Sequence, residues 1–261
     1  MFDNYLIGLR AGLEAGAAAG LLLTFAARTG RRDALRPVGA GIGVAAFLAL
    51  GFGWALTFGS QELTPRARET LGGTLSLAAV GLLTWVALRM RRAEARHMTA
   101  LLAVTAFFAV GREALDTALF FWASVQASRD GAHGPLLVVV LGLLTALVLV
   151  GLLHLGAVRA DLDRFRTWSG VALIVVAAGF LAQGVDALQE AELLGGARNT
   201  AFDISGAVPP DSWYGALLAG VVGFRPDPTV VQTVIWPLYA VPALLLLARG
   251  SRSRATRLQE I

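Results

Sequence analysis

Five charged side chains stand inside stretches that are otherwise apolar, and their spacing is repeated. Arg10 and Glu14 are four residues apart, Arg112 and Asp116 have the same separation, and Glu113 follows Arg112 directly. Residues four apart share one face of an α-helix, so each set presents its charges together. Carboxylate oxygens are the ligands that hard metal ions prefer. The pattern therefore predicts a cation site with Glu14, Glu113 and Asp116 as metal ligands, supported by Arg10 and Arg112.

The same residues also allow a purely structural interpretation. Two intrahelical ion pairs could hold the first and fourth helices together without binding an ion. An ionisable side chain at the centre of a bilayer costs roughly 2.5–3.5 kcal/mol on insertion scales, so such residues usually serve a function. A proton relay through the same acids is compatible with the cation site.

The composition places these residues in a membrane. Of the 261 residues, 56% are hydrophobic and 15% are charged, and the mean hydropathy is +0.65. A soluble domain carries about 25% charged residues. The absence of Cys excludes disulfides and thiolate metal sites. The first residues lack the positive segment of a signal peptide, so we expect the first apolar stretch to remain as a spanning helix.

The expected fold is an all-α polytopic membrane protein with seven transmembrane helices. A helix needs about 20 apolar residues to cross the hydrocarbon core. Seven stretches meet that length, near residues 4–27, 38–58, 70–89, 99–127, 136–157, 167–190 and 230–249.

The two charged clusters also indicate an internal repeat. Arg10 and Arg112 are 102 residues apart, and the same shift carries the second and third helices onto the fifth and sixth. Units of three helices enter the membrane from opposite sides, as in many secondary transporters whose sites lie between the repeats near the midplane. We therefore divide this single membrane domain into repeats 1–98 and 99–190, an outer loop 191–229, a seventh helix 230–249 and a cytoplasmic tail 250–261. At 1.5 Å per residue, Glu14 lies about 15 Å into its helix, and Glu113 and Asp116 reach a similar depth from the other side of the membrane. The repeat symmetry therefore predicts that the two clusters meet.

The arginines predict the orientation. There is no Lys, and of the 22 Arg residues 15 follow the first, third, fifth and seventh helices, against 5 in the alternate loops. The positive-inside rule then places the N-terminus outside and the C-terminus in the cytoplasm. This distribution fits a multi-pass protein of the cytoplasmic membrane, embedded in the lipid bilayer, and argues against a nucleic-acid partner despite the net charge of +4.

Two other segments carry weaker signals. Gly8, Gly12, Gly16 and Gly20 form a row of small residues that lets another helix approach closely, within the monomer or between copies. The outer loop is expected to form an ordered cap, with a partner surface as the alternative. Residues 213–224 are apolar enough to lie at the interface or re-enter as a short helix.

Acidic residues also gather at the outer end of the sixth helix. Asp186 and Glu190 are one turn apart, close to Glu192. They are either a weak outer site that gathers cations or a solvated helix end. None of the three His residues, at positions 97, 133 and 154, has the spacing of a metal ligand with another His, and we take all three as non-ligands.

Two motifs give a resemblance to a known family. Residues 10–14 (RAGLE) and 112–116 (REALD) resemble the two Arg-Glu-x-x-Glu motifs of the high-affinity iron permeases, which comprise oxidase-dependent fungal permeases and bacterial EfeU-type transporters. Residues 4–14, 29–37, 60–64 and 209–215 also resemble bacterial members, so the likeness covers nearly the whole chain. Two positions depart from the motif: Ala11 stands where the family has Glu, and Asp116 is one methylene shorter than Glu.

The resemblance implies an iron permease that carries iron ions inward as its transported substrate. No nucleotide-binding or nucleophile motif follows a predicted strand, so we expect no enzyme activity and no permanently bound cofactor. Bacterial members work with an extracytoplasmic haem peroxidase and a metal-binding protein, which the resemblance makes the expected partners. Two alternatives remain open: transport of another hard divalent cation such as manganese, and a non-transporting membrane partner or sensor.

Overall fold

The computed structural model describes residues 2–28, 31–58, 64–89, 98–127, 134–159 and 162–259. These ranges contain eight helices: α1 (Phe2–Arg28), α2 (Arg32–Phe58), α3 (Pro65–Arg89), α4 (Met98–Ala127), α5 (Gly134–Arg159), α6 (Leu162–Glu190), α7 (Trp213–Val222) and α8 (Val230–Gln259). All except α7 contain a segment long and apolar enough to cross a membrane. This confirms the expected all-α fold with seven membrane-spanning helices, and α7 is the expected short helix.

The helices form because the chain has no better way to cross lipid. An apolar segment in a bilayer must satisfy its backbone N–H and C=O groups internally, and a helix does so along its whole length. Helices α1, α3 and α5 end at Arg28, Arg89 and Arg159, where apolar sequence gives way to charge. Helix α3 starts with Pro65, whose missing N–H costs nothing at a first helical position, and the Thr64 hydroxyl accepts from the Ala67 N–H at 3.3 Å.

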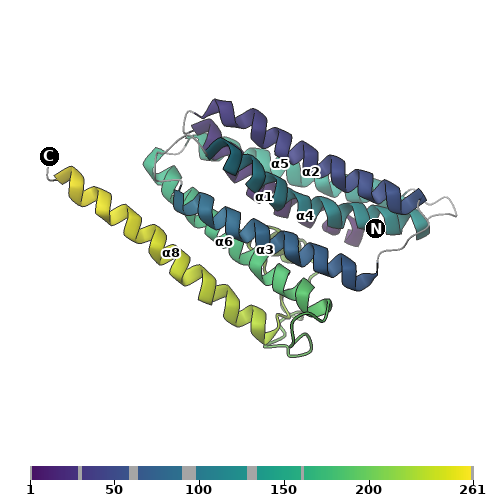
Figure 1. The fold of residues 1–261 in the computed structure, drawn as a ribbon. Coiled ribbons are helices and arrows are strands. Elements are labelled where there is room, and N and C mark those ends of the chain that lie inside the picture. Colours follow the sequence, from purple (N-terminus) through teal and green to yellow (C-terminus); the bar gives the residue numbers. More distant parts are fainter. Residues whose placement is uncertain are drawn as a thin grey trace.

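The spanning helices lie side by side in one bundle (Figure 1). Helix α8 lies along α6 at one side, α2 and α5 lie at the other, and the chain ends are at opposite ends of the bundle. The main contacts join α1 with α5, α2 with α4, and α3 with α6. If α1, α2 and α3 are exchanged with α4, α5 and α6, the α1–α5 contact becomes the α2–α4 contact, and the α3–α6 contact stays the same. An inverted repeat would give this pairing.

The glycine row on α1 faces α5 and allows the closest helix contact. A methyl group added at Gly8 would lie 2.1 Å from the Val139 carbonyl oxygen, and one at Gly12 would lie 2.6 Å from the Ala146 side chain. Gly142 on α5 contributes to the same contact, because a methyl group there would lie 2.2 Å from the Tyr5 carbonyl oxygen. The row therefore packs within the monomer, which was one of the two expected uses.

Burial separates the interior of the bundle from its lipid-facing surface. The largest core cluster includes Leu22 and Phe25 of α1, Leu83 of α3, Leu102 of α4 and Leu173 of α6. In contrast, the spanning segments of α5 and α8 have only 17% and 22% of their residues buried. Their exposed leucines and valines match the hydrocarbon around them, so these helices form much of the outer wall.

Residues 191–229 form the ordered cap that the sequence predicts. The Ala201 N–H donates to the Pro228 carbonyl at 2.9 Å, and the Val230 N–H donates to the Asn199 carbonyl at 2.8 Å. Gln189, at the end of α6, accepts from the Thr229 hydroxyl and donates to the Gly195 carbonyl. On the exposed surface of the cap, hydrogen bonds from the Ser205 hydroxyl and N–H hold the pKa of Asp203 below its usual value.

Candidate functional site

The first half of the site is a buried ion pair on α1. The Arg10 Nε donates to the Glu14 Oε1 at 2.7 Å, as their spacing of one helical turn predicts. The Glu14 side chain is only 6% exposed, whereas that of Arg10 is 50% exposed. Glu14 therefore lies inside the bundle, and Arg10 extends from it toward a cavity.

The second half is a three-residue cluster on α4. The Arg112 guanidinium lies between two acids, with Nη1 3.5 Å from the Glu113 Oε1 and Nη2 3.7 Å from the Asp116 Oδ2. The Glu113 side chain is 6% exposed and that of Asp116 is 35% exposed. Among the described residues, Glu113 Oε1 and Arg112 Nε are buried without a hydrogen-bond partner, although each is a group that normally has one.

The two halves meet where α1 packs against α4. The buried carboxyl groups of Glu14 and Glu113 lie near each other and near Arg112. Asp116 joins the same cluster through Arg112. The five charged residues therefore form one connected cluster. No group of three or more His, Asp or Glu side chains is arranged as a metal cage within the described ranges.

Two further residues belong to this cluster, and neither was among the predicted site residues. Gln183 on α6 accepts a hydrogen bond from Arg112 Nη1 and so ties α4 to α6. Glu69 on α3 interacts electrostatically with Glu190, Asp116 and Arg112. Gln183 carried a signal, because it is a polar side chain within an apolar stretch. Glu69 was missed because we expected the third helix to begin near residue 70, whereas it begins at Pro65.

Helix α7 re-enters the bundle and reaches the site. The Ser212 hydroxyl caps its first turn by accepting from the Gly215 N–H at 3.0 Å, and Gly223 ends it in the left-handed conformation with φ 66°. Its last turn packs on α1 and α6: a methyl at Gly220 would lie 2.7 Å from Leu13 Cβ, and one at Gly223 would lie 2.4 Å from Gly179 Cα.

A cavity of about 10 Å³ lies where α7 ends, lined by Glu14, Gln183 and the turn containing Gly220 and Gly223. A single water molecule needs roughly 10–15 Å³ measured in this way. The negative end of the α7 dipole favours positive charge beside Glu14. A buried carboxylate and a helix C-terminus therefore border the same small space.

The position of Gly223 leads to a testable prediction. Replacing Gly223 with alanine is expected to lower the free energy of unfolding by about 1–3 kcal/mol. An alanine there would be strained by the left-handed backbone conformation, and its methyl group would also collide with Gly179. The thermal unfolding midpoint in detergent measures the loss. Gly206→Ala is the matched control, because Gly206 lies in the same cap with open space around it. Equal midpoints for the two variants would contradict the docking of α7.

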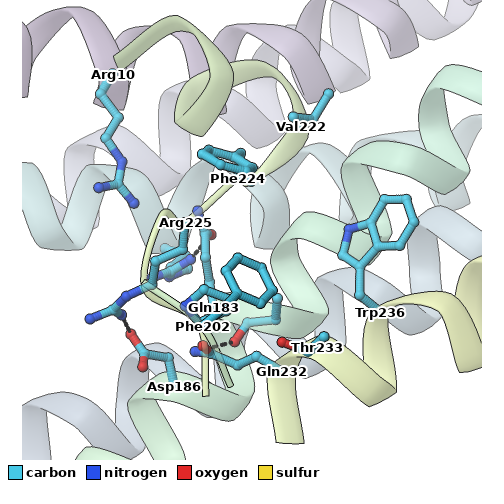
Figure 2. A pocket seen from close by; sticks show the side chains of 14 residues that line it. Arg10, Gln183, Asp186, Phe202, Val222, Phe224, Arg225, Gln232, Thr233 and Trp236 are labelled. Carbon is cyan, nitrogen blue, oxygen red and sulfur yellow. Dashed lines mark hydrogen bonds and ion pairs between the residues drawn. The ribbon is translucent and has the colours of Figure 1, made fainter. Parts of the chain in front are cut away.

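A second, larger cavity of about 280 Å³ opens beside Arg10 and Arg112 (Figure 2). Asp186 lines it and forms an ion pair with Arg225 of the cap. Glu190 is exposed and does not line this cavity. The two acids proposed as an outer cation-gathering site therefore face different surroundings. Of the three His residues, His97 and His133 lie outside the described residues, and His154 Nδ1 is 2.5 Å from the Thr24 hydroxyl.

Seven apolar helices around a buried charged cluster define a multi-pass membrane protein of the permease class. The model of the Iron permease FTR1 family matches residues 1–259. The chain belongs to this family.

Curated relatives match over nearly their whole length. The chain is 33% identical to the ferrous iron permease EfeU of Shigella sonnei strain Ss046, over 98% of each chain. The EfeU of Escherichia coli O157:H7 shows the same identity and coverage, and that of Yersinia pestis is 30% identical over 98% of this chain and 96% of its own. No solved structure matches significantly.

Proposed function

We propose that this protein moves iron ions inward across the cytoplasmic membrane through the cluster between α1 and α4. Glu14, Glu113 and Asp116 supply the carboxylate oxygens that meet the ion on its way, and Arg10 and Arg112 hold those carboxylates in place. The observation that carries the proposal is that two buried carboxyl groups, Glu14 on α1 and Glu113 on α4, lie near each other and each beside an arginine. The description of the relatives as ferrous iron permeases supports Fe²⁺ as the ion.

The electrostatics of the cluster supports a transient site. Two carboxyl groups this close repel each other when both are ionised, so an empty site is stabilised by a shared proton or by Arg112. An arriving cation replaces that compensation, and its ligands are already in place. Arg112, held by Gln183, Glu113 and Asp116, keeps the net charge low enough that the ion can leave again.

The orientation gives the direction of movement. With the N-terminus outside, the cap of residues 191–229 faces outward, where it is the surface available to an extracytoplasmic haem peroxidase and metal-binding protein. An inside-negative membrane then favours inward movement by about 2.3 kcal/mol per charge per 100 mV. The chain acts as a carrier of substrate iron and holds no permanent cofactor.

Metal uptake into proteoliposomes tests the proposal. Purified protein in sealed vesicles with an inside-negative potential is expected to accumulate Fe²⁺ faster than empty vesicles do. Mn²⁺ offered at the same concentration serves as the competing hard cation. Preferential Mn²⁺ uptake would support the manganese alternative, and no uptake of either metal by well-folded protein would support the sensor alternative.

Position 11 offers a test of how the site selects its metal. Ala11 lies one turn before Glu14 on α1, where the related motif has Glu. We expect Ala11→Glu to lower the apparent KM for Fe²⁺ uptake by about tenfold, since one added charged ligand is worth roughly 1.5 kcal/mol or more.

Ala11→Gln is the matched control, because it adds similar bulk without the charge. A KM for the Glu variant equal to that of the Gln variant would show that the site has been rebuilt around the smaller residue.

A further inference from the structure

The 280 Å³ cavity is lined by more positive charge than a cation path needs. Three guanidinium groups reach its wall, from Arg10 on α1, Arg112 on α4 and Arg225 in the cap. The carboxylate that lines it is Asp186, which is already paired with Arg225. In Figure 2 the guanidinium groups of Arg10 and Arg225 lie at one side of the view and Trp236 at the other.

These arginines have hydrogen-bond donors to spare. Arg10 uses its Nε for Glu14, and among the described residues its two terminal nitrogens have no acceptor. Arg112 lies at the same wall with a buried Nε that lacks a partner. Arg225 uses Nε for Asp227 and Nη1 for Asp186, which leaves Nη2. A guanidinium has five N–H donors and no acceptor, so this wall offers several donors to a ligand that carries acceptor atoms.

The rest of the wall selects the kind of acceptor. Phe202, Phe224 and Trp236 supply apolar surface to the same cavity. The volume is close to the lower end, roughly 300 Å³, of pockets that hold organic molecules, and is more than an inorganic oxyanion needs. Planar guanidinium forks match carboxylates with two parallel hydrogen bonds.

We propose that this cavity binds a small organic polycarboxylate, held by Arg10, Arg112 and Arg225 against the aromatic wall. Gln183 and Gly223 line both this cavity and the small one beside Glu14. A carboxylate bound in the larger cavity would therefore lie next to the proposed metal path. The anion either is a free counter-ion or arrives as a ligand of the metal. In both cases it shields an approaching cation from the guanidinium groups. The inference extends the proposed function, but its test does not depend on transport.

The first test uses the wild-type protein without metal. Isothermal titration calorimetry in detergent is expected to show saturable binding of citrate with a stoichiometry of one per chain. The neutral trimethyl ester of citrate has the same skeleton without the charges and is expected not to bind. Absence of citrate binding at millimolar concentration, or equal binding of the ester, would overturn the proposal.

The second test assigns the site. Arg225→Gln is expected to weaken citrate binding at least about tenfold, because it removes one of the three guanidinium groups of the cavity. Arg225 is chosen because it lies in the cap and does not belong to the α1–α4 cluster. Arg198→Gln, an exposed arginine of the same cap that does not line the cavity, is the control and is expected to bind as wild type does. Arg10→Gln serves as a second variant with the same expected loss, should Arg225→Gln fail to fold. Wild-type affinity in a folded cavity variant would overturn the assignment.

A third comparison identifies the source of the carboxylate. Ferrous citrate binding at least tenfold tighter than citrate indicates an anion that arrives on the metal, and equal affinities indicate a free counter-ion. The outcome for the transport path is separate: if citrate fails to bind while uptake still depends on Glu113, the carboxylate site is wrong and the proposed permease function stands.

Discussion

Replacing Glu113 with glutamine is expected to abolish iron uptake while leaving the protein folded in the membrane. The substitution keeps the size of the side chain and removes one of the two buried carboxyl groups of the site. It also removes one of the two acids that hold Arg112. A lost interaction with a charged group is worth roughly 1.5–3 kcal/mol, which corresponds to a loss of roughly 10- to 100-fold in uptake at the least. The initial rate of Fe²⁺ accumulation in proteoliposomes measures it.

The control for this variant is Glu192→Gln, the same chemical change at an exposed position of the cap. It is expected to transport at the wild-type rate. Gel filtration and circular dichroism show whether each variant remains folded. Uptake by folded Glu113→Gln at the rate of the control would remove Glu113 from the path, and a purely structural ion pair would then explain the cluster better.

Gly8→Ala is expected to cause the largest loss of stability in the bundle. Its new methyl group would lie 2.1 Å from a backbone oxygen of α5, and a backbone atom cannot move aside as a flexible side chain can. Helices α1 and α5 must separate, so the cost is expected at or above the upper end of the roughly 1–3 kcal/mol of ordinary overpacking. The yield of monodisperse protein and its unfolding midpoint in detergent measure the effect.

Gly43→Ala on α2 is the matched control, because a methyl group there meets nothing within 4 Å. In that open position alanine is the better helix former, so no loss is expected. Gly142→Ala probes the same contact from α5 and is expected to behave like Gly8→Ala. If Gly8→Ala is as stable as Gly43→Ala, the close approach of α1 to α5 is incorrect.

Loss of the α1–α5 contact has a consequence for the site. Arg10 and Glu14 lie on the same helix as Gly8 and Gly12, so displacement of α1 also displaces half of the charged cluster. A folded Gly12→Ala variant with reduced uptake would connect helix packing to the ion path, since it alters no charged residue.

The amino-acid sequence alone determined the number of spanning helices, because hydropathy over about 20 residues reflects the thickness of a bilayer and needs no tertiary information. It also determined which side of α1 packs closely, since glycines four apart fall on one helix face. The pairing of Arg10 with Glu14, and of Arg112 with Asp116, followed from the same helical spacing.

The repeat also predicted that the two charged clusters meet, but other contacts between helices were decided only by the tertiary structure. That Gln183 bonds Arg112, and that the last turn of α7 ends beside Glu14, depend on how far each helix slides and turns against its neighbours. Apolar periodicity does not specify those shifts, because lipid-facing and core-facing positions in a membrane helix are both apolar. The separation of Asp186 from Glu190 has the same cause: they are one turn apart on α6, but the cap covers only the first.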